Sequence, residues 1–129
     1  MINIRVYGIP ASQGSKRPIG NNRFIEASKK LAPWRKAVKD ASSGLVVEDL
    51  DAPIGCNIIF FLPRPKTVKR DYPTVFPDVD KTMRSTFDAL TQAGVWADDK
   101  MVCFATVSKR YETDDQPPGA FIEIWNLTK

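Results

Sequence analysis

The sequence contains no histidine and only two cysteines, Cys56 and Cys103. The missing histidines exclude Ser-His-Asp and Cys-His nucleophiles, histidine-based acid–base catalysis and His-ligated metal sites. Two cysteines are too few for a disulfide framework or a zinc site. Because both lie in apolar, strand-like runs, we expect two buried small hydrophobic side chains. A hydrolase of this composition must therefore use carboxylates, lysine or a metal bound through oxygen.

Long apolar runs are also missing. The longest run, residues 58–62, is far shorter than the ~20 residues that a membrane-spanning helix needs. The opening residues Met1-Ile2-Asn3-Ile4-Arg5 have the pattern of a strand and not that of a signal peptide. We therefore expect a cytoplasmic protein without a membrane partner, and a chain of 129 residues fits one domain over 1–129.

The charge of the chain is distributed unevenly. The net charge is +4 overall, but residues 1–70 hold 13 Lys and Arg against 5 Asp and Glu, a net of +8. Residues 71–129 hold 6 Lys and Arg against 10 Asp and Glu, a net of −4. This asymmetry favours a polyanionic partner bound beside an acidic centre, although a basic protein with solvated charges would have the same totals.

Hydrophobic periodicity predicts four strands. Apolar and polar residues alternate in residues 2–7, and residues 56–62 are apolar enough for a central strand. Residues 101–111 and 121–127 have strand character as well. The turn signal Gly20-Asn21-Asn22 adds a short hairpin to this count, for four to five strands.

Two helices are expected between the strands. The first begins at Pro33 and presents an apolar face at helical spacing, ending at Ser42-Ser43-Gly44. The second carries Val79, Met83, Phe87 and Leu90 on one face and ends near Gly94. The order of elements predicts a small α/β (α+β) domain, with a mixed sheet of four to five strands and two main helices packed on it.

Two short acidic motifs, Asp78-Val79-Asp80 and Asp98-Asp99, bracket the second helix. In an extended stretch after Pro77, residues i and i+2 point to the same side, so both carboxylates of the first motif would face one site. The alternative is helix capping for the first motif and turn chemistry for the second. For the two motifs to meet, the strand after the helix must run back along it.

Converging carboxylates repel one another, and Mg²⁺, with its preference for oxygen ligands, relieves that repulsion. Arg84 shares a helix face with Asp80 and Asp88 at i+4 spacing, which indicates either a cation beside the metal site or a surface ion-pair ladder. Basic residues crowd the neighbouring segments and favour salt-dependent binding to phosphates. Those we expect to contact nucleic acid are Lys16, Arg17, Arg23, Arg64, Lys66, Lys69, Arg70 and Lys81.

These motifs together resemble the RusA family of Holliday junction resolvases, in its phage-type form. The resemblance rests on residues 77–102, with the pattern Pro77-Asp78-Val79-Asp80, Phe87-Asp88-Ala89-Leu90 and Gly94-Val95-Trp96-Ala97-Asp98-Asp99. Residues 7–16, with Gln13-Gly14-Ser15-Lys16, are similar to the N-terminal loop of phage-type members.

The resemblance implies a homodimeric, Mg²⁺-dependent endonuclease that nicks four-way DNA junctions in pairs, with Mn²⁺ as an alternative ion and no nucleotide cofactor. It implies that Asp78, Asp80 and Asp99 match the family's essential carboxylates, and we expect the neighbouring Asp98 to be a further metal ligand. Arg84 stands where the family usually has a functional lysine, and Lys81 where an asparagine is common. The host compartment would be the bacterial cytoplasm, also for a phage-encoded protein.

Two other interpretations of the same residues remain open. Pro77-Asp78 and Asp98-Asp99-Lys100 satisfy the pattern of a PD-(D/E)xK nuclease, although the segment between them has helical and not hairpin periodicity. A non-catalytic DNA-binding protein would use the acidic residues only as caps and loop charges.

Overall fold

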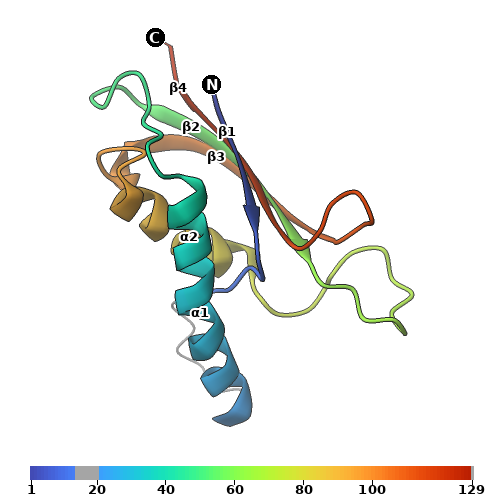
Figure 1. Ribbon diagram of the computed structural model, residues 1–129. Coiled ribbons are helices and arrows are strands. Elements are labelled where there is room, and N and C mark those ends of the chain that lie inside the picture. Colours follow the sequence, from blue (N-terminus) through green and yellow to red (C-terminus); the bar gives the residue numbers. More distant parts are fainter. Residues whose placement is uncertain (14–20, 129) are drawn as a thin grey trace.

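The computed structural model describes residues 1–13 and 21–128, and for residues 21–28 only the course of the backbone. Its sheet has four strands, and both helices pack on one face of it (Figure 1). This confirms the predicted α/β domain with a mixed sheet and two main helices. The elements are β1 (Ile2–Tyr7), α1 (Asn21–Ala41), β2 (Ile54–Leu62), α2 (Val79–Ala93), a 3-10 turn η1 (Asp99–Met101), β3 (Val102–Tyr111) and β4 (Gly119–Asn126).

The sheet has the strand order β1-β4-β2-β3, so β2 is central, as its apolar sequence predicts. The pairs β1–β4 and β4–β2 are antiparallel, whereas β2 and β3 are parallel. Parallel neighbours need a crossover connection, and α2 supplies it here. As a result β3 starts near the end of α2 and ends near its beginning, where Lys109 of β3 contacts Pro77.

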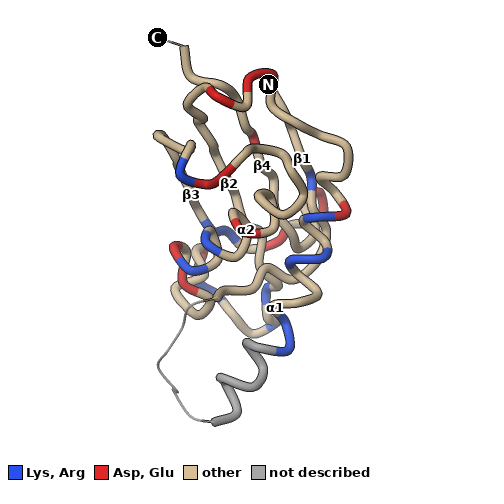
Figure 2. The backbone as a smooth tube through the Cα atoms, turned by 90° about the vertical axis from the view of Figure 1, so that its left-hand side faces the viewer, with Lys and Arg blue, Asp and Glu red and all other residues tan. Residues whose placement is uncertain are grey.

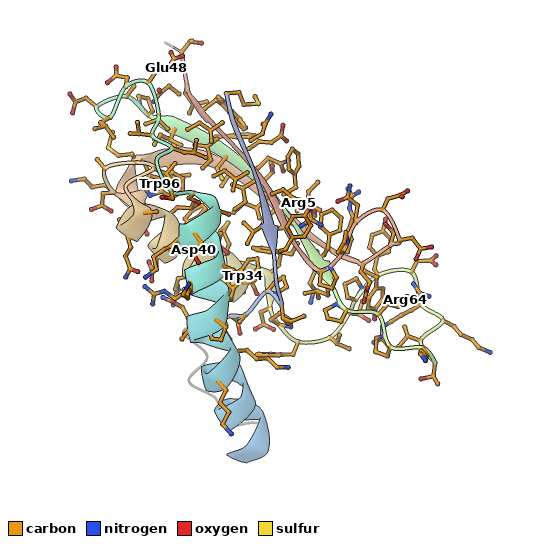
Figure 3. All side chains as sticks on the ribbon, in the orientation of Figure 1. Arg5, Trp34, Asp40, Glu48, Arg64 and Trp96 are labelled. Atoms are coloured by element: carbon orange, nitrogen blue, oxygen red, sulfur yellow. The ribbon has the colours of Figure 1, made fainter. Side chains whose placement is uncertain are left out.

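The core lies between the sheet and the two helices. Alternate residues of β2, among them Ile54, Ile58 and Phe60, point to the helices and are buried. Trp34 of α1 lies between its helix and the sheet (Figure 3), and its indole N–H donates a hydrogen bond of 3.1 Å to Thr86 of α2. This contact ties the two helices together above the sheet.

The predicted beginning of the first helix was wrong. α1 begins at Asn21 and carries Pro33 in its interior, so Asn21 and Asn22 are helical and do not form a hairpin turn. Pro33 lacks the backbone N–H that would donate to the Lys29 carbonyl oxygen. Residues 21–32, which precede it, contain no proline or glycine that would end the helix. The buried face formed by Trp34 and Val38 holds the helix against the core despite that missing bond. Residues 14–20 of the predicted hairpin lie outside the described residues.

The second face of the sheet carries no helix (Figure 1), and β3 lies at its edge. Phe104 on β3 is 50% exposed, and its ring lies 6.3 Å from that of Trp125.

Cys56, on central β2, is buried as expected, but Cys103 is exposed, so that part of the cysteine prediction was wrong. An edge strand has a neighbour on one side only, and a local apolar pattern cannot show this.

The segment between β2 and α2, residues 63–78, contains no helix or strand. It lies beside the turn between β3 and β4, at the end of the sheet away from the two termini (Figure 1). Glu112 N–H donates to the Leu62 carbonyl oxygen at 2.8 Å, and Arg64 N–H donates to the Glu112 carboxylate at 2.8 Å.

Neither described helix is long and apolar enough to cross a membrane.

Candidate functional site

The first acidic motif lies at the beginning of α2. Asp78 is the N-cap residue and has extended backbone, φ −69° and ψ 140°, while Asp80 already lies in the first helical turn. The predicted extended stretch therefore ends at Asp78. Among the described residues the Asp78 carboxylate accepts no capping hydrogen bond, and it pairs with Lys81 Nζ at 3.1 Å. Asp78 therefore holds the position of a cap without making a cap hydrogen bond. Both carboxylates face solvent at the N-terminal end of the helix, where the helix dipole favours negative charge.

Lys109 on β3 anchors the segment that leads into this motif. Its Nζ donates hydrogen bonds to the carbonyl oxygens of Val75 at 2.5 Å and Pro77 at 3.0 Å. Burial lowers the pKa of Lys109, and the nearby Asp78 carboxylate partly opposes that effect. No motif in the sequence points to Lys109, whose local signal is only a lysine on the helix-facing side of a predicted strand.

The second acidic motif forms the turn between α2 and β3. Asp98 accepts a hydrogen bond from the Lys100 backbone N–H at 3.2 Å, and this bond is the main cause that lowers the pKa of Asp98. The pKa of Asp99 is raised, first by partial burial and then by the hydrogen bond and negative charge of Asp98. The charge of Asp88 on α2 raises it further.

Asp88 is held in place by the N-terminal segment. The side-chain amide of Gln13 donates a hydrogen bond to the Asp88 carboxylate, and Gln13 N–H donates to the Lys81 carbonyl oxygen at 3.2 Å. Ser85 also donates to the Ala11 carbonyl oxygen, at 2.5 Å. The segment that enters the predicted basic loop therefore lies along α2, next to its acidic residues. The signal for Gln13 in the sequence is its place in the N-terminal motif that resembles phage-type members.

The structure thus brings Asp99 close to Asp98 and Asp88, while Asp78 and Asp80 lie at the other end of α2, where Lys109 lies near Asp78. Arg84 is exposed between these ends, one turn from Asp80 and one from Asp88. Among the side chains that the structure describes, those of residues 1–13 and 29–128, no three His, Cys, Asp or Glu lie close enough together to hold a metal ion.

The donor chemistry nevertheless fits Mg²⁺. This ion commonly takes one or two carboxylates and completes its shell with water and substrate phosphates, so a cage of three side chains is not required. Asp99 is the clearest ligand position, because partial burial and then its interaction with Asp98 and the charge of Asp88 penalise its charged form.

The predicted basic residues of the 63–78 segment are exposed. Arg64 and Arg70 both stack on the Tyr111 ring, with guanidinium carbons 5.1 and 5.9 Å from its centroid, and Arg64 lies far from α1 and α2 (Figure 3). Lys66 and Lys69 lie on the same segment and are also exposed. Both basic and acidic residues lie in the region of α2 (Figure 2). Lys16, Arg17 and the side chain of Arg23 lie outside the described residues.

The model of one protein family, described as endodeoxyribonuclease RusA, matches residues 9–125 of this chain. The chain belongs to the RusA endodeoxyribonuclease family. The match covers both acidic motifs, Gln13 and Lys109, and extends well beyond residues 77–102, where the local motifs are densest. A search of curated proteins found no match.

Membership of the RusA family makes the protein a hydrolase that cleaves phosphodiester bonds within DNA. Around α2 lie groups that such a reaction can use besides a nucleophile: carboxylates that can hold a cation, the exposed Arg84, and the basic segment that leads into Asp78. Because a guanidinium always stays protonated, Arg84 can act as an electrostatic group but not as a proton donor.

Proposed function

We propose that this protein is a structure-selective endonuclease that binds four-way DNA junctions and resolves them by paired symmetric nicks, in DNA recombination and repair in the cytoplasm. The observation that carries the proposal is the RusA family match over residues 9–125. The exposed carboxylates at both ends of α2, and the exposed basic segment that leads into Asp78, support it.

In this proposal Mg²⁺, or Mn²⁺ in its place, would be held by carboxylates at the ends of α2, Asp78 and Asp80 at one end and Asp98 and Asp99 at the other, with water and phosphate oxygens completing each shell. When bound, the ion would acidify a water molecule and stabilise negative charge on the phosphodiester. The guanidinium of Arg84 adds positive charge where the transition state becomes more negative. Gln13 orients Asp88, and Lys109 fixes the carbonyl groups that precede Asp78. The basic residues of the 63–78 segment, together with Lys16, Arg17 and Arg23, hold the DNA arms.

We further propose a homodimer, since two symmetric nicks require two sites related by a two-fold axis. The helix-free face of the sheet supports this proposal, because half-exposed Phe104 lies there beside Trp125. Size-exclusion chromatography with light scattering measures the mass directly, and a monomer at the concentrations used for cleavage would contradict this part of the proposal.

The central test uses a synthetic four-way junction incubated with protein and Mg²⁺. We expect paired nicks from the wild type and none from Asp80→Asn. The matched control is Asp114→Asn, which changes an exposed carboxylate in the turn between β3 and β4. This variant should cleave normally. Failure of the wild type to nick the junction would overturn the proposal, as would full nicking by Asp80→Asn. Preferential cutting of linear duplex would favour the PD-(D/E)xK interpretation.

Thermal unfolding in a Mg²⁺ titration tests the ion separately from the reaction. At a concentration 100-fold above its Kd, a ligand that binds only the folded state stabilises it by about 2.7 kcal/mol. We expect the melting temperature of the wild type to rise with Mg²⁺ and that of Asp99→Asn to rise much less. Equal responses of the two proteins would exclude Asp99 as a ligand. If Mg²⁺ affected neither stability nor cleavage, a non-catalytic DNA-binding role would be favoured.

A further inference from the structure

A pocket of about 250 Å³ lies directly beside the first acidic motif but contains none of its carboxylates. One wall is the segment Val75–Pro77, which leads into Asp78. The segment after β1 forms a second wall, and the end of β2 with Tyr111 of β3 forms a third. The pocket therefore joins three parts of the chain that are distant in sequence, and its lining ends at Pro77, one residue before Asp78.

The lining is apolar apart from a few polar groups. Its walls are made by Ile9, Pro10, Ala11, Leu62, Pro63, Pro65, Val75, Phe76 and Pro77. Ser12 also lines the pocket and is only 4% exposed. Its hydroxyl has no hydrogen-bond partner in the part of the chain that the structure describes. A buried hydroxyl without a partner is unfavourable, so a ligand with a polar edge would gain a hydrogen bond here without breaking an existing one.

Two cations, Lys30 of α1 and Arg70, complete the lining, and both are exposed. Arg70 is held by a 2.8 Å hydrogen bond from its Nε to the Tyr111 hydroxyl, so its charge is fixed beside the pocket. The pocket is smaller than the ~300–1,000 Å³ of sites for drug-sized ligands, which favours a single ring system. An apolar slot with one buried hydroxyl and cations at its side matches a nucleobase whose flanking phosphates stay outside.

We propose that this pocket takes one unstacked nucleobase of the DNA strand bound at the carboxylate site. The proposal rests on the proposed junction-binding function, and it names how the strand is held. Extruding a base requires least energy where its stacking is already disturbed. In an open four-way junction, whose arms are not stacked on one another, the bases at the branch point have a stacking neighbour on one side only. Capture of such a base would place the adjoining phosphate near Asp78 and would explain preference for branched over continuous duplex DNA.

The test uses four-way junctions that carry 2-aminopurine at single positions, starting at the branch point, with a linear duplex for comparison. The protein is added without divalent metal, so that binding is observed before cleavage. The fluorescence of 2-aminopurine is quenched by stacking, and we expect a several-fold rise at one position near the branch point when wild-type protein binds. The same base in the linear duplex should show little change.

Three variants assign the rise to the pocket. Val75→Trp places a large side chain at the rim and should abolish the rise, whereas Val46→Trp, on the exposed loop between α1 and β2, should keep it. Both valines are exposed, at 45% and 53%, so both variants should fold. Ser12→Ala should leave the melting temperature unchanged or raise it, yet weaken junction binding about three- to tenfold because it removes the hydrogen bond to the base.

Each other outcome counts against the proposal in a distinguishable way. Tight junction binding without a rise at any position would overturn the pocket assignment and leave the proposed function intact. A rise that persists in Val75→Trp would place the unstacked base elsewhere. No junction binding by the wild type would overturn both the pocket and the proposed function.

Discussion

Lys109 Nζ, on the edge strand β3, donates a hydrogen bond of 3.0 Å to the carbonyl oxygen of Pro77, the residue that precedes Asp78. A second hydrogen bond, of 2.5 Å, goes to the Val75 carbonyl oxygen. With these two bonds the lysine holds the segment that positions the first acidic motif. The same segment forms one wall of the proposed base pocket.

Lys109→Met should therefore slow nicking more than it weakens DNA binding. A small displacement of a group near the reaction can reduce the rate on the order of 100-fold, and we expect about ten- to a hundredfold here. Single-turnover nicking rates and junction affinities measure the two effects separately. Lys36→Met is the matched control, because Lys36 is exposed on α1 and its partner among the described residues is Asp40. Equal reductions in rate and affinity would indicate a simple DNA-binding role for Lys109.

The raised pKa of Asp99 predicts a pH-dependent stability. A carboxyl group whose pKa is higher in the folded than in the unfolded state favours folding at low pH, and that contribution is lost as the pH rises through the folded pKa. In the absence of divalent metal, Asp99→Asn should therefore melt at a higher temperature than the wild type at pH 7. Below the ordinary carboxyl pKa of about 3.9 the difference should vanish.

Thermal unfolding across this pH range, in buffer with a chelator, checks the Asp99 prediction. Asp114→Asn serves as the control, because it changes one exposed carboxylate in the turn between β3 and β4 and removes the same charge. A lower melting temperature for Asp99→Asn at pH 7 would show that the Asp99 charge is stabilised by its surroundings, contrary to the repulsion from Asp98 and Asp88.

Exposed lysines of the 63–78 segment should contribute to binding through phosphate neutralisation alone. For Lys66→Ala and Lys69→Ala we expect weaker binding to every DNA sequence, with the slope of log K against log salt falling by about 1 for each phosphate that is no longer neutralised. Fluorescence anisotropy over a range of salt concentrations measures this slope. An unchanged slope in both variants would move the DNA path away from this segment. Arg64 and Arg70 are less suitable, since they also pack on Tyr111.

Gly119 supports the pairing of β1 with β4. It has φ +151°, and a Cβ there would lie 1.8 Å from the Val6 carbonyl oxygen. Gly119→Ala should therefore reduce the free energy of unfolding by at least about 3 kcal/mol, since backbone must move. Gly44→Ala is the control: Gly44 also has positive φ, +79°, but a Cβ would meet nothing within 4 Å. Its cost should be about 1–2 kcal/mol, and chemical denaturation of both variants measures the difference.

Local patterns in the sequence determined much of this protein. The period of Val79, Met83, Phe87 and Leu90 predicted α2, and Gly94 ends it with the left-handed conformation that glycine adopts easily. Alternating residues predicted the strands, and the absence of histidine restricted the chemistry to carboxylates and cations. The acidic motifs and their spacing around α2 indicated the family that the match over residues 9–125 confirms.

Tertiary structure decided which side chains meet. Because β2 and β3 pair in parallel, Lys109 lies within hydrogen-bond distance of the Pro77 carbonyl oxygen. The path of the N-terminal segment likewise places Gln13 beside Asp88. It also left Cys103 exposed on an edge strand and extended α1 through Pro33. Periodicity reports only on neighbours within one helix or strand, whereas these contacts depend on strand order and packing, which no local pattern encodes.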